Sequence, residues 1–354
     1  MFERENNEVN NAITILQNID LDTIASIFRF AVIYYASRKV TQGVALQIEY
    51  HFPKCKKIKM PPELVLESGD FQVDDKIKEE DKAHILNFIN TVCSNFSDDC
   101  LILLCNNLKS LKLKDTYHQK HIFNPDVTGA YNLKKNAIII RDCSLYNPIY
   151  HELFHLSSSI IQDKTTFSGF SQDAFGKGLN EGYTQLLTER YFAKESVIDS
   201  SYPIQKRIVQ VLEIIVGKDE MEQLYMQANL KGLVDFLSKY ATEKEILSFI
   251  SNVDFTMQYL PNHKFLLFKK YLLRKAFSSI SDFLIKIFIK YFASLAIDSN
   301  VDEEKLHYKF MLFLSLLSIS INISGEEYVL LNEDTYYNIL HSILDNNFKT
   351  NKIK

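Results

Sequence analysis

The sequence lacks the features that mark three large classes of protein. It has no Lys- or Arg-rich run and a net charge of only −4, so a nucleic-acid-binding surface is not indicated. Its five cysteines are an odd number without a CxxC pair, which argues against a disulfide framework and against a cysteine-based zinc site. Its most apolar segment, residues 310–323, is short and interrupted by serines, so no membrane span is expected.

A secretory signal is also missing from the start of the sequence. Residues 1–11 are polar and acidic, whereas a signal peptide has an apolar central region. Together with the cysteine usage, this predicts a cytoplasmic protein in a reducing compartment. Export by a route that needs no amino-terminal signal is the alternative, and no pattern in the sequence indicates an oligomeric state.

What the sequence does contain is an HExxH motif, His151-Glu152-Leu153-Phe154-His155. Side chains four positions apart project from the same face of a helix, so the two imidazoles can bind one metal ion. Asn147-Pro148, immediately upstream, is a helix-start signal with Asn as N-cap and Pro at the first helical position. The motif therefore predicts a helix that carries half of a zinc site. The plainer alternative is two histidines on the surface or in the core of an amphipathic helix.

A third ligand for this zinc site is found further along the chain. A catalytic zinc ion has three protein ligands and leaves a position for water. Glu181, in Gly178-Leu179-Asn180-Glu181-Gly182-Tyr183-Thr184, has a helix-starting context and is the candidate. We therefore expect one Zn²⁺ per chain, held by His151, His155 and Glu181, with Glu152 directed at the water.

At these residues the sequence resembles the gluzincins, the zinc metallopeptidases of the zincin fold whose third ligand is a glutamate on a second helix. The resemblance covers residues 128–195 and has three parts: Gly129-Ala130-Tyr131 with Asn136-Ala137-Ile138-Ile139-Ile140, then His151 to His155, then Asn180-Glu181-Gly182-Tyr183-Thr184. It implies that His151, His155 and Glu181 bind zinc and that Glu152 is the general base. The sequence departs from the family at Gln185, where an acidic residue is common.

The segment before the motif predicts a β-hairpin. The β-branched run Ala137-Ile138-Ile139-Ile140 is typical of a buried strand, and residues 129–133 would pair with it. By its resemblance to the zincin edge strand, Gly129-Ala130-Tyr131 would bind an extended peptide by strand addition. An ordinary structural hairpin is the alternative. Zinc aminopeptidases carry a glutamate just after this segment and this chain has none, so endopeptidase is preferred.

Glycines are few, and their positions point to the region of the metal. Only ten occur, and Gly169, Gly176 and Gly178 all lie in the stretch from Thr165 to Gly178 between the two ligand segments, where they predict tight turns. The stretch is either a lid or a simple connector. Gly182, inside the expected second helix, predicts a close approach of the two ligand helices.

Supporting residues are less clearly marked. The oxyanion of the tetrahedral intermediate needs a donor, and the candidates are Tyr183, Tyr202, Tyr259, His263 and His307. The second N–H of a ligand histidine needs an acceptor, for which Asn180, Gln185 and Glu189 are the candidates. For Glu189 a solvated surface charge is the favoured interpretation.

The rest of the pattern predicts an α+β, zincin-like protein. Residues 1–163 would form a lobe with a small mixed sheet and the HExxH helix, and residues 164–354 an all-helical lobe. Helices are expected at 21–37, 79–96, 99–111, 203–216, from a capping box at 242–245, and at 265–297, 302–323 and 326–347, with a strand at 44–52.

These expectations favour a zinc-dependent peptidase acting on a peptide or protein substrate. Zinc lowers the pKa of its water to near 7, and Glu152 would take the water's proton and pass it to the leaving amine. Two alternatives are left open. One is a non-catalytic or regulatory interaction protein on a zincin scaffold, and the other is an effector protease of narrow specificity.

Overall fold

In the computed structural model, the residues described are 58–61, 79–115, 129–140, 148–193, 202–259, 267–297, 303–318, 321–323 and 326–328. The chain divides into two compact units, Phe52–Ser279 and the combination of Met1–His51 with Ile280–Lys354. The boundary expected between residues 163 and 164 falls inside the first of these. The compact units therefore do not coincide with the two expected lobes.

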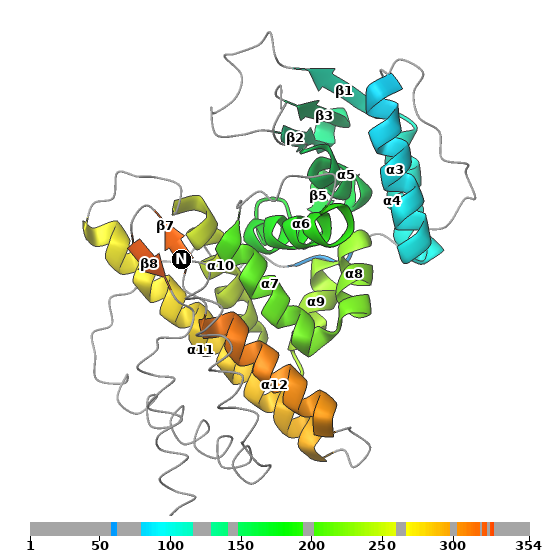
Figure 1. The fold of residues 1–354 in the computed structure, drawn as a ribbon. Helices are drawn as coiled ribbons and strands as arrows, with labels where there is room; N and C mark the ends of the chain where they lie inside the picture. Colours follow the sequence, from blue (N-terminus) through cyan, green and yellow to red (C-terminus); the bar gives the residue numbers. More distant parts are fainter. Residues whose placement is uncertain are drawn as a thin grey trace, which may run out of the picture. The chain divides into compact units, whose positions relative to one another are not determined.

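The unit Phe52–Ser279 is mostly helical, with two small sheets (Figure 1). Its elements, in chain order, are α3 (Glu79–Asn95), α4 (Asp98–Leu108), β1 (Lys112–Asp115), β2 (Gly129–Asn132), η1 (Leu133–Lys135), β3 (Ala137–Ile140), α5 (Ile149–Ser157), β4 (Ser159–Gln162), β5 (Thr165–Ser168), β6 (Ser171–Gln172), α6 (Lys177–Phe192), α7 (Pro203–Val216), α8 (Lys218–Met226), α9 (Leu230–Leu237), α10 (Glu243–Tyr259) and the start of α11 (Leu267–Ile297).

The predicted hairpin is confirmed and belongs to a three-stranded mixed sheet with the order β1-β3-β2. β2 and β3 pair antiparallel, with Tyr131 opposite Ile138, and β1 pairs parallel to β3. Asn136 ends the connection in the left-handed conformation at φ 43°, which asparagine tolerates better than most residues. Its amide nitrogen donates to the main-chain oxygen of Asn107 at 2.6 Å, which ties the hairpin to α4.

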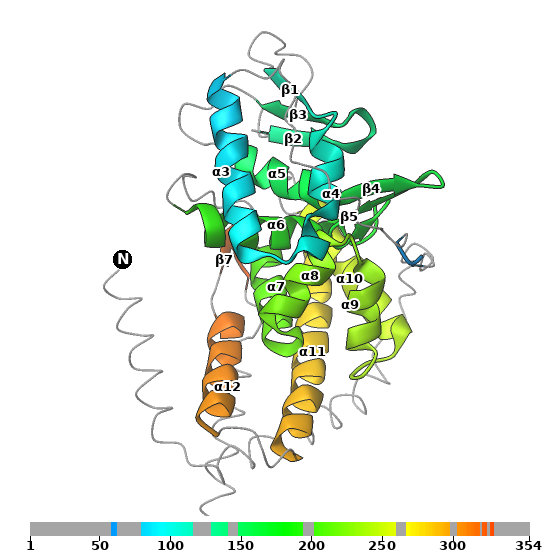
Figure 2. The same ribbon diagram turned by 90° about the vertical axis from the view of Figure 1, so that its right-hand side faces the viewer.

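The HExxH helix, α5, lies between this sheet and α6 (Figures 1 and 2). It begins at Ile149 with Pro148 as N-cap, one residue later than predicted, and Asn147 lies outside the described residues. Since proline has no N–H, its position at the helix start costs no main-chain hydrogen bond. Behind the helix, Phe154 meets Phe88 of α3 with ring centroids 4.9 Å apart, and Tyr150 stacks on Phe192 of α6 at 4.2 Å. These buried contacts hold α5 in place.

A loop was expected from Thr165 to Gly178, but this stretch contains two strands, β5 and β6. β4, β5 and β6 form an antiparallel sheet in that order, and the turn between β4 and β5 has Asp163 and Lys164 in the left-handed region. The prediction of tight glycine turns is confirmed at Gly169 and Gly176, which have positive φ of 49° and 82°. At Gly178 it is wrong, because this residue lies in the first turn of α6. At Gly176 a Cβ would lie 2.2 Å from the main-chain oxygen of Phe170.

Gly182 does mark a close approach of helices, but the neighbour is α7 and not α5. A Cβ on Gly182 would lie 2.5 Å from the carbonyl carbon of Gln205. Main-chain atoms cannot move aside as a flexible side chain can, so only glycine allows α6 and α7 to pack at this distance.

The helical elements after residue 201 are largely as predicted. The start and stop signals at Pro203 and Gly217 bound α7. The capping box opens α10, with the main-chain N–H of Thr242 donating to Glu245 at 3.0 Å and the N–H of Glu245 directed at the Thr242 hydroxyl at 3.4 Å.

In the second unit, the prediction of an all-helical carboxy-terminal part is wrong. α12 (Glu303–Ser318) ends earlier than expected and is followed by the antiparallel strands β7 (Ile321–Ile323) and β8 (Glu326–Tyr328). α12 packs on α11 through the rings of Phe313 and Phe288, which stack with centroids 3.6 Å apart. The elements expected at 21–37 and 44–52, and the end of the helix expected at 326–347, lie outside the described residues. Among the helices described, none is long and apolar enough to cross a membrane.

Candidate metal centre

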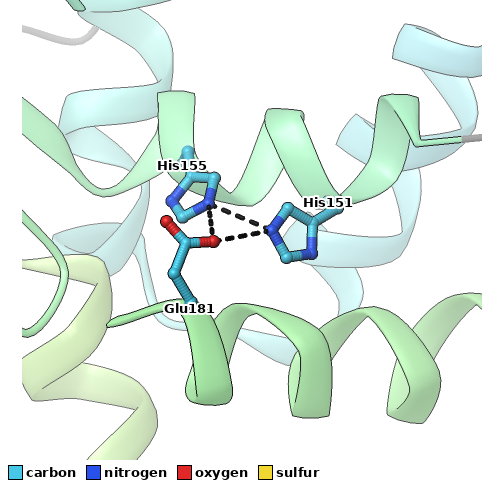
Figure 3. Close-up of side chains that lie close together, drawn as sticks. All are labelled: His151, His155 and Glu181. Carbon is cyan, nitrogen blue, oxygen red and sulfur yellow. Dashed lines mark hydrogen bonds and ion pairs between the residues drawn. The ribbon is translucent and has the colours of Figure 1, made fainter. Parts of the chain in front are cut away.

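The three predicted ligands come together in one cluster (Figure 3). His151 and His155 project from α5, and Glu181 reaches up to them from the first turns of α6. The Oε2 atom of Glu181 lies 3.3 Å from Nε2 of His151 and 3.3 Å from Nε2 of His155, and the two nitrogens are 3.1 Å apart. The side chains are 10–14% exposed, so the cluster is open to solvent on a small area only.

These distances fit a tetrahedral zinc ion. Zinc binds histidine nitrogen and carboxylate oxygen at about 2.0–2.2 Å, so two ligand atoms of one tetrahedron lie about 3.3 Å apart. The three separations in the cluster are 3.1, 3.3 and 3.3 Å. The donor set of two imidazoles and one carboxylate is also one that zinc prefers. The residues present therefore fit the ion that the sequence predicts.

The buried carboxylate of Glu181 also favours a cation at this position. Burial raises the pKa of Glu181. Electrostatic attraction to His155 and hydrogen bonds from both histidine rings outweigh burial and hold the pKa of this carboxyl well below its usual range. A buried carboxylate needs a positively charged partner, because desolvation otherwise disfavours its ionised form. A divalent cation at the same point would satisfy this requirement while both rings stay neutral.

Glu152, the predicted general base, points toward the sheet from the next position on α5. Its carboxyl has a pKa raised to about 7, and burial is the main cause. His151 lowers this pKa, Glu181 raises it, and a hydrogen bond from the main-chain N–H of Tyr131 lowers it. A Cβ on Gly129 would lie 3.1 Å from its Oε1 atom. Glu152 is therefore in contact with β2, the strand predicted to bind substrate.

The three predicted substrate-binding residues, Gly129, Ala130 and Tyr131, all lie in β2. In the part of the chain that the structure describes, β2 is an edge strand, paired with β3 on one side only. The Tyr131 N–H that reaches Glu152 lies on the other side. The edge of the sheet therefore faces the carboxylate beside the metal ligands.

The second nitrogen of each ligand histidine has a polar neighbour. Nδ1 of His151 lies 3.2 Å from Oε1 of Gln185. Nδ1 of His155 lies 3.3 Å from Nδ2 of Asn180 and 3.5 Å from Oγ1 of Thr184. A metal ion on Nε2 leaves the hydrogen on Nδ1, and the Thr184 oxygen is the neighbour able to accept it.

Glu189 is not the solvated surface charge that was expected. Its side chain is 22% exposed and forms an ion pair with Lys206 of α7 at 2.7 Å. It also accepts a hydrogen bond of 3.1 Å from Nε2 of Gln185. Glu189 therefore belongs to the surroundings of His151 and not to the outer surface.

Of the candidate oxyanion donors, the structure brings Tyr202 to the site. Its ring stacks on that of His151, with centroids 6.2 Å apart and planes inclined by 21°. Tyr183 is buried and its hydroxyl donates to Glu213 at 3.0 Å. Its hydrogen is therefore directed at Glu213 and not at the metal-ligand cluster. The side chains of Tyr259, His263 and His307 lie outside the described part of the chain.

One supporting residue escaped the sequence analysis. Asp254, on α10, accepts hydrogen bonds from the main-chain N–H groups of Gly176 at 2.8 Å and Gly178 at 2.7 Å. The signal that could have suggested it is the glycine at the N-cap of α6, which has no side chain to cap the helix. The sequence does not reveal which distant residue supplies the cap.

Comparisons with protein-family models, with curated proteins and with solved structures found no match for this chain.

Proposed function

We propose that the protein is a zinc-dependent peptidase of the zincin type. The observation that carries the proposal is the triangle of ligand atoms from His151, His155 and Glu181, with sides of 3.1–3.3 Å, which fits a tetrahedral zinc ion. Three protein ligands are the number that catalytic zinc sites use, whereas structural sites have four. Glu152 beside this cluster supplies the base that the reaction needs.

The substrate of the proposed enzyme is an extended peptide that adds to the edge of β2. Strand addition aligns a peptide by main-chain hydrogen bonds, whatever its side chains are. Because β2 contacts Glu152 through Gly129 and Tyr131, a peptide on this edge passes the metal ligands. Binding along a strand edge requires no chain terminus, so the proposed action is that of an endopeptidase.

In the proposed hydrolysis of the peptide bond, zinc, Glu152 and Tyr202 have separate roles. When bound, zinc lowers the pKa of a water molecule and polarises the peptide carbonyl. Glu152 takes the proton from the attacking water and gives it to the leaving amine as the C–N bond breaks. Tyr202, stacked beside His151, is the proposed hydrogen-bond donor to the oxyanion.

Replacing Glu152 by Gln tests the proposal most directly. The amide has nearly the shape of the carboxyl but cannot accept the proton, so cleavage of a peptide library should slow by about 10²- to 10⁴-fold. Metal analysis should still find one zinc per chain, since Glu152 is not a ligand. Glu220→Gln, at an exposed position of α8, is the matched control and should leave both quantities unchanged.

Two results would contradict the proposal. One is wild-type protein that binds no zinc when the ion is supplied in excess. The other is Glu152→Gln protein that cleaves peptides as fast as wild type, because the base would then lie elsewhere. The same peptide library shows the breadth of specificity, since an effector protease should cut very few of its members.

A further inference from the structure

A chain of polar contacts leads away from His151 on the side of Nδ1, the ring nitrogen that faces away from the metal-ligand cluster. Nδ1 lies 3.2 Å from Oε1 of Gln185. Nε2 of Gln185 donates to Oε1 of Glu189 at 3.1 Å. Nζ of Lys206 in turn donates to both oxygens of Glu189, at 2.7 and 2.8 Å. Gln185 and Glu189 are one turn apart on α6, and Lys206 comes from α7.

The chemistry of each group determines the direction of these hydrogen bonds. A primary amide has an accepting oxygen at one end and a donating NH₂ at the other, whereas a carboxylate only accepts. Glu189 therefore requires the NH₂ end of Gln185, and the amide oxygen is left to face His151. That oxygen requires a hydrogen on Nδ1.

A neutral imidazole carries a single ring hydrogen. When this hydrogen is on Nδ1 of His151, Nε2 has a lone pair, and Nε2 is the atom that lies 3.3 Å from Glu181 and 3.1 Å from His155. A metal ion binds this lone pair. The opposite tautomer has a hydrogen on Nε2 and cannot bind the ion. The orientation of one amide thus decides whether His151 is ready to act as a ligand.

The residues around Gln185 hold its side-chain amide in this one orientation. Gln185 is only 5% exposed, so little water competes for its two ends. The side chains of Lys206 and Glu189 are 19% and 22% exposed, and the lysine bonds to both carboxylate oxygens, which holds the acceptor in place. Hydrogen bonds to charged groups are about twice as strong as those between neutral groups. The contact with Glu189 therefore dominates the choice of orientation.

We propose that Glu189, held by Lys206, is a positioning residue for the metal centre. Acting through the Gln185 amide, it selects the tautomer of His151 whose Nε2 lone pair faces the metal. The inference rests on the proposed zinc site. In many metal sites a carboxylate contacts the ligand histidine directly. Here the carboxylate of Glu189 lies one helical turn further away, and its effect on the tautomer of His151 is transmitted by the amide of Gln185.

Exchanging the two charges separates this role from a merely structural one. In the double variant Glu189→Lys with Lys206→Glu, the ion pair between α6 and α7 is kept. The lysine at 189 can only donate, so the amide of Gln185 should turn its oxygen to 189 and its NH₂ to His151. Zinc affinity, measured by competition with a fluorescent chelator, should fall by about 10- to 100-fold. Affinity equal to wild type would overturn the proposal.

Two comparisons show whether the effect passes through Gln185. In a Gln185→Ala background there is no amide to turn, so the same exchange should cause no further loss of zinc affinity. Losses that simply add would contradict transmission through the amide. As a matched control, Lys231→Asp with Asp235→Lys exchanges the charges of an ion pair on α9 and should not change zinc affinity.

The tautomer can also be observed directly, by ¹⁵N NMR of the His151 ring in zinc-free Glu181→Ala protein at alkaline pH, where imidazoles are neutral. This substitution removes the carboxylate that would otherwise accept a hydrogen from Nε2 of His151. We expect the hydrogen on Nδ1 when Glu189 and Lys206 are in place and on Nε2 when they are exchanged. The same tautomer in both would overturn the proposal, even if the protein proved to bind no zinc. If wild type binds no zinc, the proposed function fails separately from this inference.

A single substitution provides the test if the exchanged protein does not fold. Glu189→Gln replaces the accepting carboxylate by an amide that can both accept and donate, so both orientations of Gln185 become allowed. Both tautomers of His151 should then be detected, with a weaker, several-fold loss of zinc affinity. A spectrum with the hydrogen on Nδ1 alone would contradict the role of Glu189.

Discussion

The carboxylate of Asp254 accepts a hydrogen bond of 2.7 Å from the main-chain N–H of Gly178, at the beginning of the helix that carries Glu181. A second bond of 2.8 Å comes from the N–H of Gly176, the N-cap of α6. The first N–H groups of a helix have no partner within it, and a glycine cannot supply one. Asp254 caps α6 from α10 and so sets the position from which Glu181 reaches the two histidines.

Removing this cap should destabilise the protein. Asp254→Ala leaves two partly buried N–H groups without their acceptor, at a cost of about 1–3 kcal/mol in the free energy of unfolding. Urea denaturation of zinc-free protein measures it. Asp235→Ala, which removes an exposed carboxylate from α9, is the control and should change stability by less than about 0.5 kcal/mol. Equal effects of the two substitutions would contradict the capping role.

The same carboxylate should give stability a particular pH dependence. Burial raises the pKa of Asp254 to about 6, although the N–H groups of Gly178 and Gly176 lower it, and in unfolded chains an aspartate titrates near 3.9. Between these values the folded protein binds more protons than the unfolded one. The contribution of Asp254 to stability should therefore fall as pH rises from about 4 to 6, by up to about 1.4 kcal/mol per pH unit, and be constant above.

Comparison with Asp254→Asn isolates this contribution, because the other titrating groups are the same in both proteins. The difference in unfolding free energy between wild type and variant, measured by urea denaturation across this range, should shift with pH in the direction given. A difference that does not change with pH would show that Asp254 titrates normally.

Tyr202→Phe tests the proposed oxyanion donor. The variant keeps the ring that stacks on His151 and loses only the hydroxyl, so zinc affinity should be unchanged. The rate constant kcat for peptide cleavage should fall by about 10²- to 10³-fold with little change in KM, because the bond is made in the transition state. Tyr308→Phe, at an exposed position of α12, is the control. Full activity of Tyr202→Phe would exclude the hydroxyl from the reaction.

Zinc should stabilise the fold by mass action. An ion that binds only the folded protein adds about 2.7 kcal/mol at a concentration 100 times its Kd, so Tm should rise with zinc and fall with a chelator. Glu181→Gln, which removes the charged ligand, should weaken this response, and Glu220→Gln should preserve it. A Tm that does not respond to zinc in wild-type protein would contradict a metal site that joins α5 to α6.

Several features of the site could be predicted because they depend on local geometry. The spacing of His151 and His155 places both rings on one face of a helix in any fold, and the β-branched run before them pairs with its own neighbour along the chain. The capping box at Thr242 is another such case. In each, the residues that interact are a few positions apart, so periodicity and turn chemistry determine the outcome.

The remaining features involve residues that are far apart along the chain. The sequence alone determined that two imidazoles share a helix face and that a glutamate follows in a second helix. Only the tertiary structure decided that Glu181 lies 3.3 Å from both rings, that Asp254 caps its helix, and that Lys206 holds Glu189 beside Gln185. These contacts depend on how helices pack, and helix packing is set by the shapes of whole buried surfaces, which no short sequence pattern contains.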